Sequence, residues 1–181
     1  MKPDRLSLGG GRVIRRPLSF VILALALSFA GLHPGASAQT AGADRRTYGT
    51  ASCRVEAPVE WSAGHITWIG SCKDGYAEGL GVLRNTVEGT SAELFLGRVE
   101  QGSLRSGVLV AAQGYTAGRW EAGSVAESGT DDQANRNAIL AGFEDGAKAA
   151  DATSRSMAKH SNPKSSRFYS RLAKRLRSQM D

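Results

Sequence analysis

The sequence contains only two cysteines and three histidines in 181 residues. So few cysteines exclude a small domain held together by many disulfides. A zinc site needs about four ligands at suitable spacing, and His65 is the only histidine close in sequence to Cys53 and Cys72. We therefore expect no metal and no other cofactor.

The common catalytic motifs are missing as well. The chain has no His-Glu-x-x-His, no Gly-x-Ser-x-Gly, no P-loop and no Gly-x-Gly-x-x-Gly. Asp131 and Asp132 fit the start of a helix better than a calcium loop, because the alternating ligands that should follow them are absent. A lone histidine such as His65, without an orienting partner, is weak evidence for general base chemistry. We therefore expect a protein that is not an enzyme.

The length allows one modest domain, or a small domain with an appendage. It is too short for a TIM barrel, which needs about 250 residues. The 22 glycines have no three-residue period, which excludes a collagen-like chain.

A long apolar run occurs once, at residues 18–30, after three arginines and before a small-x-small pattern at 36–38. This order is typical of a secretory signal peptide. We predict a signal peptide over 1–38, cleaved between Ala38 and Gln39, a flexible linker over 39–50, and a periplasmic or secreted mature protein. The alternative is an uncleaved anchor, but a spanning helix needs about 20 apolar residues. The run reaches that length only by including Arg15 and Arg16.

The two cysteines enclose a loop of about 20 residues. Because an exported chain meets an oxidising compartment, the pair predicts a structural disulfide between Cys53 and Cys72. The chain-entropy model gives such a loop about 3 kcal/mol of stabilisation. A redox pair would more typically have the spacing Cys-x-x-Cys.

Glycines recur at a fixed spacing in the middle of the chain. Each of three units has two glycines five residues apart, and the pairs are Gly70 and Gly75, Gly97 and Gly102, and Gly118 and Gly123. Large residues flank the first glycine at alternate positions and project to one face of a strand. The second glycine follows turn-compatible residues, as in a short hairpin turn. The pattern predicts antiparallel hairpins with return strands at 77–83 and 104–110.

This unit resembles the MORN repeat, a β-hairpin module, over about residues 65–125. The first copy carries every glycine of the family pattern, including Gly79 and Gly81. The second departs from it, because Ser106 and Val108 stand where glycines are expected and Gly107 lies out of register. The third has no return strand that we can place. The alternative is a generic glycine-rich antiparallel sheet, which is also a stack of hairpins, so either interpretation predicts a β-hairpin domain over 51–128.

The repeat aromatics can be either core or surface. They are Trp68, Phe95, Tyr115 and Trp120. In an array of three units most of them must be core, whereas exposed aromatics would form a protein-interaction surface. In residues 53–61 apolar residues alternate weakly with others, and this pattern predicts an added strand. The disulfide would hold that strand on the first hairpin as an N-terminal cap.

From residue 130 the pattern becomes helical and continues to residue 181. Thr130 or Asp131 can serve as N-cap, and one helix face is formed by Ile139, Phe143, Ala147, Ala150, Ser154 and Met157. Asn162 as N-cap and Pro163 at the first position start a second helix. Its apolar stripe is Phe168, Leu172 and Leu176, with Tyr169, Ala173 and Met180 alongside.

The net charge of +6 is unevenly distributed. Residues 1–38 hold five basic residues, residues 39–154 carry a net charge of −5, and residues from 155 onward carry +7. The basic residues of the second helix are Lys164, Arg167, Arg171, Lys174, Arg175 and Arg177. They fit a solvated face on a helix attracted to its own acidic body, an interfacial helix on anionic lipid, or a site for a partner or an anionic polymer. We expect no nucleic-acid partner, because no such motif is present in this exported chain.

The predicted fold class is mainly β plus α: a MORN-like hairpin sheet followed by two C-terminal helices. The resemblance implies membrane-proximal scaffolding and protein interaction. We therefore predict a non-catalytic, exported binding or scaffold protein of the cell envelope that uses its hairpin sheet to contact a protein partner. The alternative is a peripheral membrane protein that binds anionic lipid through its basic C-terminal helix.

Overall fold

A computed structural model describes residues 46–61, 64–89, 92–126 and 129–181. The predicted signal peptide over 1–38 and most of the predicted linker lie outside these residues. The end of that linker is a strand rather than flexible chain, because Thr47–Thr50 pairs with the strand that follows it. Among the described residues, no helix is both long enough and apolar enough to cross a bilayer.

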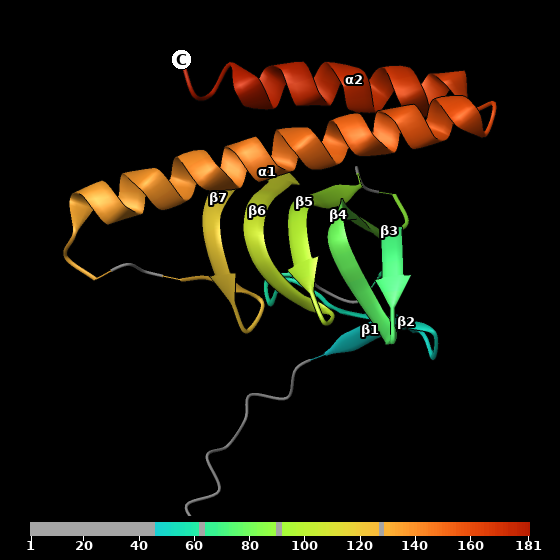
Figure 1. The fold of residues 1–181 in the computed structure, drawn as a ribbon, viewed down its shortest axis with the longest axis horizontal. Helices are drawn as coiled ribbons and strands as arrows, with labels where there is room; N and C mark the ends of the chain where they lie inside the picture. Colours follow the sequence, from blue (N-terminus) through green and yellow to red (C-terminus); the bar gives the residue numbers. More distant parts are fainter. Residues whose placement is uncertain (1–45, 62–63, 90–91, 127–128) are drawn as a thin grey trace, which may run out of the picture. The chain divides into compact units, whose positions relative to one another are not determined.

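The fold is a curled, mostly antiparallel sheet followed by two helices, which confirms the predicted class (Figure 1). The strands are β1 (Thr47–Thr50), β2 (Cys53–Glu56), β3 (His65–Lys73), β4 (Gly75–Thr86), β5 (Glu93–Glu100), β6 (Ser103–Ala111), β7 (Gly114–Glu121) and β8 (Ser124–Val125). The helices are α1 (Asp132–Lys159) and α2 (Pro163–Arg177). The strand order is β1-β2-β4-β5-β6-β7-β8, and β3 also pairs with β4.

The second glycine of each repeat unit lies in a hairpin turn. Gly75, Gly102 and Gly123 have φ of +82°, +79° and +77°, and the residue before each of them also has a positive φ. Two consecutive residues with positive φ form the type I′ turn, whose twist matches that of the flanking strands. The third unit does have a return strand, the two-residue β8.

Two of the first glycines of the repeat, Gly97 and Gly118, belong to a row of four glycines across the sheet. Gly81, Gly97, Gly107 and Gly118 are paired in sequence across β4, β5, β6 and β7. Gly107, which lies out of register with the repeat pattern in the sequence, is thus brought into the row. Between Arg98 and Val99 the register shifts by one residue, so Arg105 is an extra residue in β6 and Gly107 comes opposite Gly97. This irregularity is a β-bulge, which also bends the strand.

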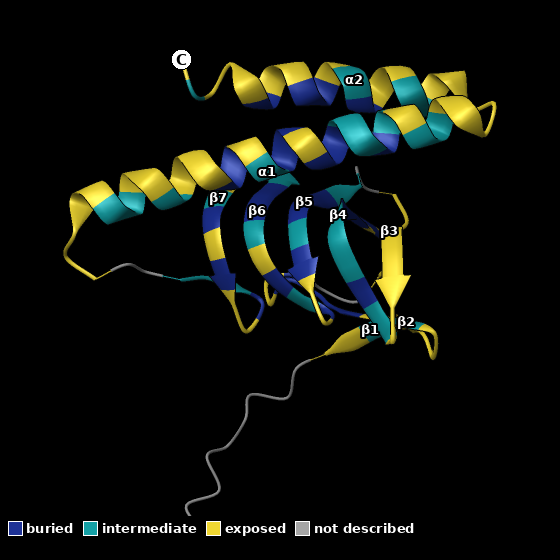
Figure 2. Ribbon diagram, viewed as in Figure 1, coloured by how far each residue is buried: buried dark blue, intermediate teal, exposed yellow. Residues whose placement is uncertain are grey.

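Each face of the sheet has its own core (Figure 2). On the helical side, side chains of β4, β5 and β6 such as Val82, Leu96 and Val108 pack against α1 and α2. On the opposite side Phe95 and Trp120 are fully buried. Both faces of the hairpin sheet are thus covered by this chain's own residues.

Residues 53–61, which we call the strap, run across the ends of the hairpins. Cys53 pairs with Gly75, the Glu56 backbone N–H donates to the Gly102 carbonyl at 2.7 Å, and the Val59 N–H donates to the Gly123 carbonyl at 3.0 Å. The strap is therefore not simply a strand added to the first hairpin, because it contacts all three turns at three-residue intervals. The predicted disulfide between Cys53 and Cys72 is confirmed and fastens its first residue to β3.

The helix α1 begins after Asp131, whose carboxylate accepts from two backbone N–H groups, and it crosses the helical face of the sheet. The predicted apolar face is only partly buried. Phe143, Ala147 and Ala150 are buried, but Ile139 is 43% exposed because the first turns of α1 reach past β7 (Figure 1).

Gly142 is where α1 comes closest to the sheet. A Cβ atom at this position would lie 2.5 Å from the Gly118 backbone nitrogen and 2.7 Å from the Gly107 carbonyl oxygen. Because both are backbone atoms, the helix itself would have to move. We expect Gly142→Ala to lower the free energy of unfolding by about 2 kcal/mol, although alanine is otherwise the better helix former.

The comparison variant is Gly146→Ala in the same helix, where the nearest obstacle is a methyl group of the buried Val108 side chain and not backbone. Its effect should be smaller by at least about 1 kcal/mol in urea denaturation. A Gly142→Ala protein as stable as the wild type would contradict this account of the helix–sheet contact.

The helix α2 has Asn162 as N-cap, as predicted, with the Asn162 side chain accepting from the Ser165 N–H at 3.1 Å. It lies along α1 on the side away from most of the sheet (Figure 1). Leu172, Ala173 and Leu176 are buried, whereas Phe168, which the pattern placed in the same stripe, is 41% exposed. The contact with α1 therefore buries a narrower stripe of α2 than the apolar stripe predicted from the sequence.

Candidate functional site

The repeat aromatics take up three different environments. Phe95 and Trp120 meet edge to face at 5.2 Å, and the Trp120 Nε1 donates to the Gly107 carbonyl at 3.2 Å inside the core. Trp68 is half-buried over Gly70 and Gly81, and its Nε1 donates to the Ser71 carbonyl at 3.0 Å. Tyr115 is 36% exposed. The four aromatics therefore do not form one surface.

The two histidines of the predicted mature chain are also apart. The His65 ring lies 3.2 Å from the Thr67 hydroxyl on β3, and the His160 ring lies 2.8 Å from the Ser156 carbonyl at the end of α1. No group of three His, Cys, Asp or Glu side chains that could hold a metal ion occurs in the described parts of the chain.

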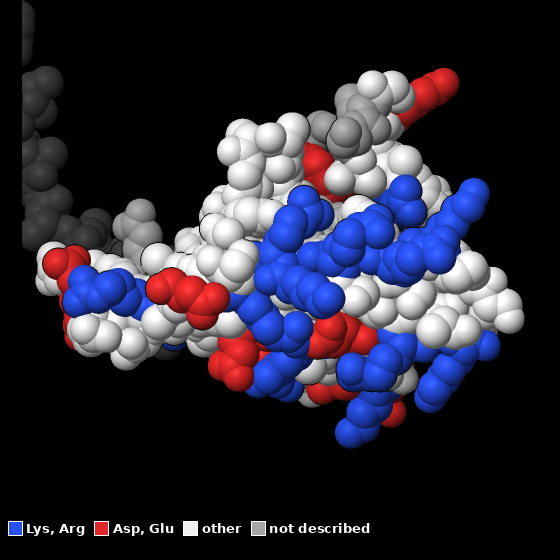
Figure 3. All heavy atoms as spheres, turned by 90° about the horizontal axis from the view of Figure 1, so that it is seen from above, with Lys and Arg blue, Asp and Glu red and all other residues white. Residues whose placement is uncertain are grey.

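The basic residues of α2, by contrast, gather on one side of the helix. With Leu172 and Leu176 against α1, the residues three and four positions apart on the opposite side point to solvent. We call these residues the outer face of α2: Lys164, Arg167, Phe168, Arg171, Lys174 and Arg175, all of them exposed. Figure 3, which looks onto the helical side, shows Lys and Arg gathered in a continuous band.

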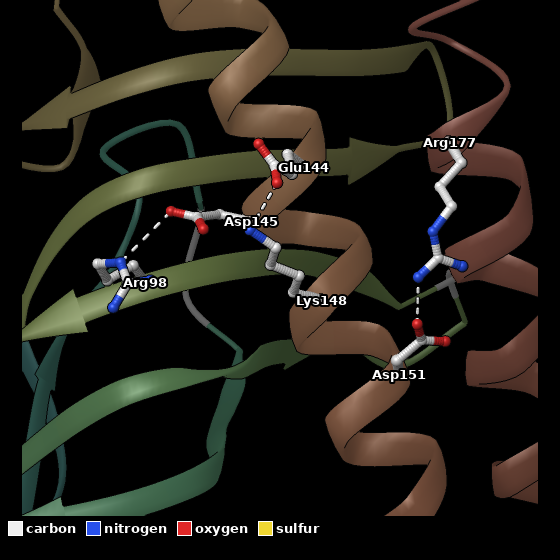
Figure 4. A network of polar contacts seen from close by, with 6 residues as sticks. All are labelled: Arg98, Glu144, Asp145, Lys148, Asp151 and Arg177. Atoms are coloured by element: carbon white, nitrogen blue, oxygen red, sulfur yellow. Dashed lines mark hydrogen bonds and ion pairs between the residues drawn. The ribbon is translucent and has the colours of Figure 1, made fainter.

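The five cations of the outer face form no ion pair with any residue that the structure describes. Arg177, which lies off this face, does pair with Asp151 of α1 (Figure 4). Among the described residues, the expected attraction between the basic tail and the acidic body is therefore seen as one ion pair, and the apolar stripe packs α2 against α1. Exposed pairs of this kind contribute about 0.2–1 kcal/mol.

Two acidic side chains of α1 have partners outside α2. Asp145 lies 3.4 Å from Arg98 of β5, and Glu144 lies 2.6 Å from Lys148 one helical turn away (Figure 4). The hydrogen bond and the charge of Lys148 lower the pKa of Glu144 below its usual value. Glu144 and Asp145 are thus paired with β5 and with α1 itself rather than with α2.

A hollow of about 470 Å³ lies at the N-terminal end of α2, between this helix and the adjoining ends of β4 and β5. Arg84 and Leu94 line it from the sheet, and Lys164, Phe168 and Tyr169 line it from the helix. Burial raises the pKa of Tyr169 above its usual value, and the charge of Arg84 partly offsets this rise. Tyr169 thus stays protonated at neutral pH.

Arg84 is the site residue that the sequence did not reveal. It lies 80 positions before Lys164, and nothing in the repeat pattern singles it out. The alternation of β4 does place it on the same face as Val82, which is buried under the helices. Only the packing of α2 shows that this is the side on which the basic helix lies.

A comparison of the chain with protein-family models, with curated proteins and with solved structures finds no match. The resemblance to MORN repeats therefore stays a prediction from the glycine pattern, and the function has to be argued from the chain's own surface.

Proposed function

We propose that the protein is a non-catalytic, exported binding protein of the cell envelope that adsorbs to anionic phospholipid through the outer face of α2. The observation that carries this proposal is the row of five exposed cations on α2, none of which has an ion-pair partner in the described parts of the chain. The hairpin sheet, which resembles MORN repeats, is the scaffold that presents this helix.

Adsorption of this kind is electrostatic. A Lys or Arg close to an anionic membrane contributes about 1 kcal/mol, so five on one face contribute up to about 5 kcal/mol. An interfacial amphipathic helix would also bury its apolar side in lipid, but Leu172 and Leu176 are used against α1. Phe168 is the single large apolar residue on the outer face.

A protein partner is the second candidate, and the observation that favours it is the edge of the sheet at β3. Within the described chain β3 pairs only with β4, and Trp68 on this strand is half-exposed. An open strand edge can pair with a strand of another protein.

Vesicle flotation tests the lipid proposal. We expect the wild-type mature chain to float with vesicles that contain phosphatidylglycerol at about 0.1 M salt and to be released at about 1 M, because the screening length falls from about 10 to about 3 Å. Vesicles of phosphatidylcholine alone are the control and should bind no protein. Absence of flotation on anionic vesicles at about 0.01 M salt would overturn the proposal.

A further inference from the structure

The hollow at the N-terminal end of α2 offers hydrogen-bond donors and positive charge. Arg84 from β4 and Lys164 from α2 both line it, and neither forms an ion pair with a described carboxylate. Two cations from elements far apart in the sequence thus meet at one opening, where an anion would interact with both.

Tyr169 adds a hydrogen-bond donor to the same hollow. The residue is only 4% exposed and lines the opening, and its hydroxyl has no hydrogen-bond partner among the residues that the structure describes. The hydroxyl oxygen is not one of the fully buried side-chain atoms that lack a partner, so it is open to solvent. An anionic oxygen in the hollow could therefore reach this hydroxyl and accept a hydrogen bond from it.

Apart from Ser165, the rest of the lining is apolar. The Phe168 ring stands edge to face with Tyr169 at 5.1 Å, and Leu94 is buried beneath. Phe168 is also part of the outer face, so the hollow opens at the end of the surface that we propose to lie on the membrane. A ligand that suits this lining has a compact anion next to an apolar chain.

We infer that the hollow holds the headgroup of one anionic phospholipid, with its phosphate oxygens between Arg84 and Lys164 and accepting from the Tyr169 hydroxyl, and with the start of its acyl chains against Phe168. The inference rests on the proposed function. It adds a specific lipid site at one end of the outer face to the electrostatic attraction between this face and the membrane. It makes binding selective for a phosphate monoanion attached to an apolar chain.

A short-chain lipid tests this site without a membrane surface. Dihexanoyl phosphatidylglycerol is titrated into the mature chain below its micelle concentration, and amide NMR shifts are followed. We expect saturable shifts centred on Leu94, Lys164 and Tyr169. Arg84→Gln should weaken binding about tenfold and Tyr169→Phe about fivefold, as loss of one charge-assisted hydrogen bond predicts.

The matched control is Arg136→Gln, which removes one exposed charge outside both the hollow and the outer face and should change the affinity less than twofold. Arg84 is exposed, so its replacement should leave the thermal midpoint unchanged. Equal weakening in Arg84→Gln and Arg136→Gln would overturn the inference, and so would inorganic phosphate competing as strongly as the lipid.

The experiments distinguish failure of the proposed membrane adsorption from failure of the headgroup site. If the wild-type chain does not float with anionic vesicles, both claims are wrong. If it floats but shows no saturable binding of the short-chain lipid, only the headgroup site is wrong and the outer face keeps its role.

Discussion

Replacing both Cys53 and Cys72 with alanine should lower the free energy of unfolding by about 3 kcal/mol relative to the wild type. The disulfide closes a loop with a sequence separation of 19, and a loop of this size restricts the unfolded chain by about that amount. In thermal unfolding the loss corresponds to a midpoint lower by about 10 °C. The measurement is urea or thermal denaturation of both proteins under oxidising conditions.

The loss of stability in the variant without the disulfide should be concentrated in the strap. Without its anchor at Cys53, the hydrogen bonds from Glu56 to Gly102 and from Val59 to Gly123 should open first, so these two amides should lose exchange protection before those of β5 and β6. The wild type under reductant is the control and should match the variant. A double variant within about 1 kcal/mol of the wild type would contradict the role of the disulfide.

Much of the hairpin sheet could be predicted from local chemistry. Gly75, Gly102 and Gly123 mark turns because two consecutive residues with positive φ favour glycine, and this requirement is visible in the sequence. The glycine row could not be predicted in full, because it depends on the extra residue Arg105 in β6. A bulge is set by how two strands pair, and spacing along one strand does not reveal it.

In the helices, too, local features could be predicted from the sequence better than packing could. Asn162 and Pro163 predicted the start of α2, because N-caps act within one turn. Which apolar residues are buried was predicted less well. Ile139 and Phe168 lie on the apolar faces of their helices, yet both are exposed, because burial depends on where the neighbouring element ends. For the same reason the sequence placed the cations on one helix but could not place Arg84 beside them.

Neutralising the outer face of α2 should abolish adsorption to anionic vesicles. The variant changes four residues to glutamine: Arg167, Arg171, Lys174 and Arg175. Lys164 is kept because it lines the hollow. At about 1 kcal/mol for each cation, the partition coefficient should fall about 10³-fold. None of the four has an ion pair in the described chain and all are exposed, so stability should change by less than about 0.5 kcal/mol.

The control removes the same number of charges elsewhere. Changing Lys73, Arg105, Arg119 and Arg136 to glutamine gives a chain of equal net charge, and all four are exposed on strands or at the far end of α1. If the protein were attracted to membranes only through its net charge, the two variants would lose binding equally.

The most direct test of the outer face of α2 is the ratio of the partition coefficients of these two variants, measured by flotation on phosphatidylglycerol vesicles at about 0.1 M salt. We expect the outer-face variant to bind at least about 100-fold more weakly than the charge-matched control, and the control to stay within about tenfold of the wild type. Equal binding by the two variants would show that the outer face of α2 is not the surface that meets the membrane.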